Sequence, residues 1–432
     1  MGGRISLRVV SMMFALTYVL EELLDFLIGF NAVGALILAF YALVSSCLNG
    51  RLISVKTNFI WLFLVITLIS ITAFSSPLGC SVEWRGVISL LFLGGMSSVF
   101  LSINFSRFTL DRLTGDFALM LVAFFLLLGA LGMGINTVLP DFTRKGADPF
   151  YEPSNLAIYM LPIMATRLLL RPKDKLDLLV LLMSAVLAPS STLLLGAIGT
   201  FGIYVIASKG ALFKKIWLYP LLMVLVFAIV GNFSSMDATT DRIQGVFTGL
   251  KGSASDGTNV SSLVWLNGWS QAIQTAGQTM WLGTGFNQMG CGQFHDAGVF
   301  SPLIEILAGE VLNYNSGSFL VAKLIAELGV GGIGIALFLS WRSIKAILAA
   351  SKVQEASNSV DRTILIARSV SGLVMLMYLY VRGMGYFHLP FLWALAMLLG
   401  RCKPVCYRNR QDTISQRNGN GNDLSTELNV TG

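Results

Sequence analysis

Charge is scarce in this sequence. Only 12% of its 432 residues are charged, whereas 55% are hydrophobic. A soluble domain carries about twice that charged fraction, so the composition argues against a soluble protein. Histidine is rarer still, with two residues in the chain, no H-E-x-x-H motif and no external carboxylate cluster with metal-ligand spacing. A metal-dependent hydrolase is therefore not expected, and we predict neither a metal nor a cofactor.

In place of charge the chain has a series of long apolar runs. Several reach roughly 17 to 25 residues, which lets a helix cross the ~30 Å hydrocarbon layer of a bilayer. We expect an all-α, polytopic bundle of about 12 transmembrane helices, with both termini in the cytoplasm. The runs fall near residues 9–20, 27–48, 58–74, 86–103, 116–138, 155–170, 176–188, 193–207, 216–232, 318–340, 364–381 and 389–400.

The net charge of +7 comes from basic residues in the short segments between these runs. Lys and Arg collect in cytoplasmic loops, so this placement indicates topology rather than a nucleic-acid surface. With twelve crossings, 23 of the 30 Lys and Arg residues share the side of the termini. The seven on the outer side are Arg85, Arg144, Lys145, Arg242, Lys251, Lys323 and Arg382. This bias predicts a multi-pass protein of a bacterial inner membrane.

The longest segment between runs, residues 232–316, is predicted to form a large periplasmic loop. Within it, residues 261–275 carry Trp265 and Trp269 at i, i+4 spacing, which favours an amphipathic helix. That helix would lie either on the membrane surface or against the bundle. We expect one membrane domain over residues 1–400, including this loop, and a polar, disordered cytoplasmic tail over 401–432.

Glycine clusters and cysteines carry weaker signals. The clusters at 129–134 and 329–334 do not follow a strand, so they predict close helix packing rather than a phosphate-binding loop. Of five cysteines, Cys80 and Cys291 are expected on the outer side. We expect both to remain free thiols; a disulfide, should one form, would join these two.

Several outer cations lie at the predicted membrane edge, namely Arg144, Lys145, Arg242 and Arg382. The planar guanidinium group donates paired, charge-assisted hydrogen bonds to phosphate. The alternative for each residue is contact with lipid headgroups or a side chain extended towards the interface. Considered as a group, these residues favour a phosphate-binding site.

Four further polar residues lie near the same predicted edge. Glu152 and His388 are candidate general bases, because a carboxylate or imidazole at an apolar boundary suits proton transfer. Each is equally compatible with a hydrogen-bonded position at a helix end. Lys323 and Glu327 are four residues apart, and we expect them to form a structural ion pair within a helix.

Three segments together resemble the superfamily of O-antigen polymerases (Wzy-type) and O-antigen ligases, which are integral membrane glycosyltransferases. They are 149-PFYEPSNLAIYMLP-162, 282-LGTGFNQMG-290 and 315-NSGSFLVAKLIAELGVGGIGI-335. Their order and spacing, with the position of the long loop, extend the resemblance over most of the chain. Two departures exist: Tyr314 precedes Asn315 where ligases commonly have His, and residues 261–269 lack the arginine of many relatives. The missing His favours a polymerase.

The resemblance implies transfer of an undecaprenyl-diphosphate-linked glycan onto a lipid-linked repeat unit at the periplasmic face. The residues that would bind the diphosphate are Arg144, Arg242 and Arg382. Asn315 would orient a sugar, and Glu152 or His388 would remove the proton from the acceptor hydroxyl. The expected partners are the lipid-linked oligosaccharide, membrane lipids, a chain-length regulator and a flippase. An O-antigen ligase and a lipid-linked oligosaccharide flippase remain the alternatives.

Overall fold

The computed structural model describes about two fifths of the chain. The described residues are 16–17, 37, 115, 153–170, 190–208, 260–309, 311–315, 317–356, 359–383 and 385–399. Within these ranges all regular secondary structure is helical and no strand occurs. The elements are α8 (Pro153–Leu170), α10 (Ser191–Ala207), α13 (Val260–Gln278), η2 (Gly292–Phe294), α14 (Ser301–Ala308), α15 (Leu320–Leu348), η3 (Ala349–Lys352), α16 (Ser359–Tyr380) and α17 (Leu389–Leu399).

Two of the described helical stretches are long and apolar enough to cross a membrane, Leu320–Lys352 and Asp361–Tyr380. Three shorter apolar helices accompany them, over Ala157–Leu170, Thr192–Ala207 and Leu389–Leu399. All five coincide with runs predicted from hydropathy. The other predicted spans and the tail from residue 401 lie outside the described residues.

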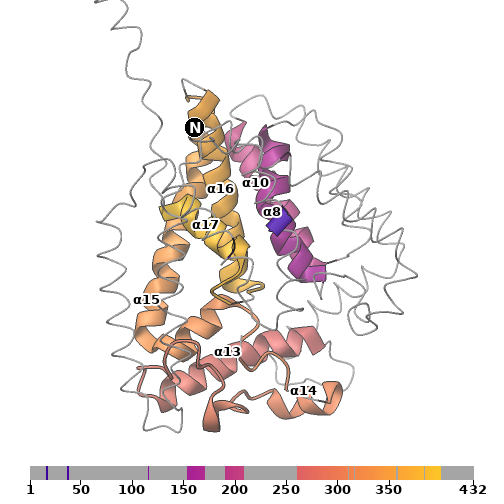
Figure 1. The fold of residues 1–432 in the computed structure, drawn as a ribbon, viewed down its shortest axis with the longest axis vertical. Helices are drawn as coiled ribbons and strands as arrows, with labels where there is room; N and C mark the ends of the chain where they lie inside the picture. The colour runs from indigo at the N-terminus through magenta and orange to yellow at the C-terminus, as the bar shows by residue number, and fades with distance from the viewer. Residues whose placement is uncertain are drawn as a thin grey trace, which may run out of the picture.

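Helices α8, α10, α15, α16 and α17 pack side by side as a bundle (Figure 1). Large side chains fill its interior, and Tyr159, Tyr378 and Trp393 are at most 1% exposed. Small residues let the helices approach: a Cβ at Gly372 of α16 would lie 2.6 Å from the Ser343 carbonyl oxygen of α15. Close backbone approach of this kind is typical of helix pairs in membranes.

One face of α15 is apolar and exposed. Val330, Leu337, Trp341 and Leu348 are each between 49% and 63% exposed and recur at helical spacing. Lys345 places its ammonium group 4.0 Å from the Trp341 ring centroid. An apolar face of this length is unfavourable in water and suits contact with lipid.

Helix α13 lies across one end of the bundle, and α14 lies beyond it (Figure 1). Ten residues of α13 are buried, and the rings of both Trp265 and Trp269 contact Phe319, just before α15. The Trp265 indole N–H donates to the Tyr380 carbonyl oxygen at 2.9 Å. Of the two sequence alternatives for this helix, packing against the bundle is the one observed.

Helix α15 is kinked at Gly329, where φ is 54° and ψ is −127°. Only glycine adopts this conformation without strain. A Cβ at this position would also lie 1.8 Å from the Trp281 carbonyl oxygen. The glycine cluster at 329–334 therefore admits the backbone of a loop, whereas the sequence suggested only the approach of another helix.

Candidate functional site

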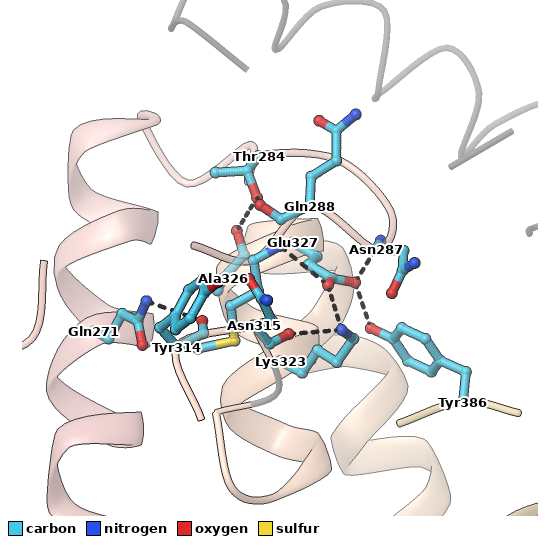
Figure 2. A network of polar contacts seen from close by, with 11 residues as sticks. Gln271, Thr284, Asn287, Gln288, Tyr314, Asn315, Lys323, Ala326, Glu327 and Tyr386 are labelled. Carbon is cyan, nitrogen blue, oxygen red and sulfur yellow. Dashed lines mark hydrogen bonds and ion pairs between the residues drawn. The ribbon is translucent and has the colours of Figure 1, made fainter. Parts of the chain in front are cut away.

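The carboxylate of Glu327 is the centre of a buried polar network (Figure 2). Glu327 is 0% exposed, and four groups point at its two oxygens. Oε1 accepts from the backbone N–H of Met289 at 3.2 Å and faces the Lys323 ammonium at 3.1 Å. Oε2 accepts from the backbone N–H of Asn287 at 2.9 Å and from the Tyr386 hydroxyl at 2.7 Å. A buried carboxylate is tolerated when it is paired and hydrogen-bonded in this way.

Lys323 links the network to the segment before α15. Its ammonium group donates to the Asn315 carbonyl oxygen at 2.8 Å and lies 5.5 Å from the Tyr386 ring centroid. The predicted Lys323–Glu327 ion pair is therefore confirmed. The two side chains of this pair also form hydrogen bonds with three other segments of the chain, so the pair connects these segments.

Tyr386 closes the network from the loop between α16 and α17. Burial raises the pKa of its phenol well above the usual 10.0, and the neighbouring charge of Glu327 and their hydrogen bond raise it further. The phenol therefore remains a hydrogen-bond donor. Its ring also stacks on Phe286, with centroids 4.6 Å apart.

The loop over residues 279–290 docks on the kink of α15 through its backbone. The N–H groups of Thr284 and Gly285 donate to the carbonyl oxygens of Ala326 and Glu327, at 3.0 and 2.9 Å. In an unbroken helix these carbonyls would accept from residues one turn later, so the kink at Gly329 frees them. The Val330 N–H in turn donates to the Trp281 carbonyl oxygen at 3.0 Å.

Two of the segments that carry the family resemblance therefore meet in space. Residues 282–290 and 315–335 are joined by the Glu327 carboxylate and by backbone hydrogen bonds across the kink. Gly283, with φ of 86°, passes so close that a Cβ would lie 2.3 Å from the Glu327 carbonyl oxygen. The glycines in both segments permit this contact.

Arg382 and His388 lie in the loop between α16 and α17, and both contact the start of α8. The Arg382 Nε–H donates to Asn155 Oδ1 at 3.3 Å. Nδ1 of His388 lies 3.2 Å from the Tyr159 hydroxyl, one helical turn further along. His388 is 7% exposed, whereas Arg382 is partly exposed. The third resembling segment, which contains Asn155 and Tyr159, thus adjoins this loop.

The remaining predicted site residues are distributed as follows. Asn315 is exposed, one residue after Tyr314, and its carbonyl oxygen binds Lys323. Arg144, Arg242 and Glu152 lie outside the described residues, as does Lys145. Within the described ranges, no group of three or more His, Cys, Asp or Glu residues is placed to hold a metal ion.

Cys291 forms a disulfide, and its partner lies outside the described residues. The expectation of a free thiol at this position is therefore wrong. Cys291 directly follows the docked loop and precedes η2. The disulfide therefore restricts the chain next to the docked loop.

Sequence reasoning missed two polar residues of this region. Gln271, on α13, is 1% exposed and donates its amide N–H groups to the carbonyl oxygens of Phe294 and Tyr314, at 3.1 and 3.2 Å. His295 follows η2, and its ring centroid lies 4.1 Å from that of Tyr314. For Gln271 the available signal in the sequence was a glutamine within an uncharged, amphipathic stretch. No signal in the sequence marked His295, because its contact with Tyr314 forms only when the chain folds.

Comparison of the chain with protein-family models, with curated proteins and with solved structures gives no match.

Proposed function

We propose that this protein is a polysaccharide polymerase of the bacterial inner membrane, with about twelve transmembrane helices and a periplasmic active site. It transfers a glycan from undecaprenyl diphosphate to a sugar hydroxyl of a lipid-linked repeat unit. The proposal is supported by the order of the three resembling segments and by the distribution of Lys and Arg between the two sides.

The observation that carries the proposal is the assembly of these segments around one end of the bundle. Residues 282–290 dock on 315–335 through Glu327, and Tyr386 joins them to the loop that holds Arg382. Arg382 in turn contacts Asn155 of the remaining segment. Fixed donors at one end of a bundle are suited to binding a charged group at the membrane interface.

In this proposal Arg382, with Arg144 and Arg242, binds the diphosphate and stabilises the charge that develops on it as it leaves. Asn315 orients a sugar, and Glu152 or His388 is the base expected from the sequence. The diphosphate is a good leaving group, so no covalent intermediate is required. The chain also depends on a flippase for substrate and on a chain-length regulator for product size.

A deletion strain tests the proposal against its two alternatives. Loss of a polymerase leaves lipid A core carrying one repeat unit, visible by gel electrophoresis of the lipopolysaccharide. Unmodified core with external lipid-linked polymer would instead indicate a ligase, and internal lipid-linked units would indicate a flippase. Either of these results would overturn the proposal.

Arginine substitutions test the site itself. Arg382→Ala should abolish long chains while single repeat units still reach the core, because the diphosphate loses a charged partner. Arg382→Lys keeps the charge but not the planar group and should restore only part of the chain length. Arg362, which is exposed near the start of α16, provides the matched control: Arg362→Ala should leave the polysaccharide ladder unchanged. Full-length chains from Arg382→Ala would remove this residue from the mechanism.

A further inference from the structure

His295 is one of only two histidines in the chain and lies in the segment that follows the docked loop. Its side chain is 46% exposed, and its Nδ1 lies 2.5 Å from Oδ1 of Asp296. A carboxylate oxygen accepts, so Nδ1 carries the hydrogen in this contact. In the neutral imidazole this leaves the lone pair on Nε2, the atom that a general base would use.

The His295 ring is held against a second segment of the loop. Its centroid lies 4.1 Å from that of Tyr314, and the exposed Asn315 follows directly. Asp296 and Tyr314 are the titratable residues whose contacts with this imidazole the structure describes. The exposed imidazole therefore packs on a partly exposed phenol ring, and the exposed Asn315 is the next residue along the chain.

Buried groups fix this arrangement from below. Gln271 binds the carbonyl oxygens of both Phe294 and Tyr314, the residues adjoining His295 and Asn315. Phe294 is 0% exposed and anchors η2. A Cβ at Gly290, where φ is 74°, would lie 2.7 Å from the Tyr314 carbonyl oxygen, so the two segments touch through their backbones. Positioning of this kind is what a catalytic side chain needs from its surroundings.

We infer that His295, oriented by Asp296, is the general base of the glycosyl transfer; this inference rests on the proposed function. Nε2 takes the proton of the acceptor hydroxyl as its oxygen bonds to the anomeric carbon of the donor. The bond between that carbon and the diphosphate oxygen breaks, and its electron pair leaves with undecaprenyl diphosphate. The imidazolium then returns the proton to water. His388 is less suited to this step, since it is 7% exposed and its Nδ1 contacts Tyr159.

The test uses the full-length protein in nanodiscs and lipid-linked repeat units extracted from the deletion strain. Chain elongation is followed by gel electrophoresis or mass spectrometry. His295→Ala should lower the elongation rate by about 10²- to 10⁴-fold, the range for loss of a general base. Added imidazole should restore part of the rate, and Asp296→Asn should cause a smaller loss. Gln293→Ala is the matched control, because this neighbour is exposed and belongs to η2; its rate should equal that of the wild type.

The outcomes separate this inference from the proposed function. If the wild-type protein does not elongate the lipid-linked unit, the proposed function fails. If it does and His295→Ala keeps the wild-type rate, the inference alone is overturned. The pH–rate profile gives a second readout, because the rate should fall at acidic pH when a general base becomes protonated. The inference is also overturned if His295→Ala lowers the rate, imidazole does not restore it and the fall at acidic pH remains. Loss with imidazole rescue and a flattened acidic limb supports it.

Discussion

The bundle and the outer layer, defined as residues 260–319, satisfy their polar groups in different ways. In the bundle, several hydroxyl groups bond back to their own helix, as Thr166 does to the Pro162 carbonyl oxygen and Thr200 to that of Gly196. In the outer layer, Gln271 and Asn267 bond to segments 23 to 43 residues away. Glu327 connects the two regions, because it lies on α15 yet accepts from the outer loop.

In the proposed topology the difference follows from the solvent of each region, with the bundle in lipid and residues 260–319 outside it. Inside a bilayer no water is available, so a polar group is satisfied most simply within its own helix. Outside it, irregular backbone is stable when buried side chains supply the partners that a helix or sheet would otherwise provide. Removing such a partner should therefore affect the outer layer more than the bundle.

The largest expected effect comes from Glu327→Ala. This change leaves the Lys323 charge buried without its carboxylate and removes the acceptor of two backbone N–H groups and the Tyr386 hydroxyl. We expect the free energy of unfolding to fall by about 3 to 5 kcal/mol. Thermal unfolding in detergent, followed by tryptophan fluorescence, measures this loss.

Two controls sharpen that comparison. Glu305→Ala removes an exposed carboxylate from α14 and should change the stability by less than about 0.5 kcal/mol. In the double variant Lys323→Met with Glu327→Gln, no buried charge is left unpaired, so the loss should be smaller than the sum of the single losses. Additive losses of stability would show that Lys323 and Glu327 do not stabilise each other as an ion pair.

The next effect concerns two neighbouring glycines of α15. Gly329→Ala forces a Cβ into the Trp281 carbonyl and a strained φ, so we expect a loss of about 3 kcal/mol. Gly331 has nothing within 4 Å of a built Cβ, so Gly331→Ala should leave stability equal or raise it by about 0.5 kcal/mol. Equal melting temperatures for the two variants would show that the kink does not hold the outer loop.

Tyr386→Phe keeps the stacking on Phe286 but removes one hydrogen bond to Glu327. A hydrogen bond to a charged group contributes about 1.5 to 3 kcal/mol, so the loss should fall in that range. Because the phenol pKa is raised in the folded state, its contribution is fully present below pH 10.0. It declines as the pH rises above that value, since the unfolded state then releases the proton first.

Measuring stability between pH 8 and about pH 11 checks this sign. The difference between the wild type and Tyr386→Phe should shrink as the pH rises. A difference that grows with pH would contradict the burial of a neutral phenol beside the carboxylate.

The smallest effects compare one threonine from each region. Thr279 accepts from the Gly283 N–H at 3.0 Å, so Thr279→Val leaves a buried donor without a partner and should cost about 1 to 3 kcal/mol. Thr166 only donates to the carbonyl oxygen of its own helix, which already accepts there, so Thr166→Val should cost less than about 0.5 kcal/mol. The reverse order in chemical denaturation would contradict the proposed contrast between the regions.

The helices were largely predictable from the sequence. Runs of apolar residues anticipated α8, α10, α15, α16 and α17, because burial in lipid or protein demands the same continuous hydrophobicity. The spacing of Trp265 and Trp269 anticipated α13, and the spacing of Lys323 and Glu327 anticipated their ion pair. Each of these signals is local in the chain.

The contacts that assemble the site were not predictable in this way. Glu327 accepts from residues about forty positions earlier and from Tyr386 fifty-nine positions later, and no periodicity encodes such distances. Helix α14 was also missed, as it has eight residues and begins at Ser301 inside a turn-rich loop. Arg144, Arg242 and Glu152 stay predictions, since they lie outside the described residues.

Elongation by the purified protein tests the central claim most directly. Full-length protein in nanodiscs is mixed with lipid-linked repeat units from the deletion strain, and the lipid-linked products are separated by size. The proposal predicts a ladder of two or more repeats, with one undecaprenyl diphosphate released for each new bond. Repeat units that stay single in the presence of folded protein would contradict it.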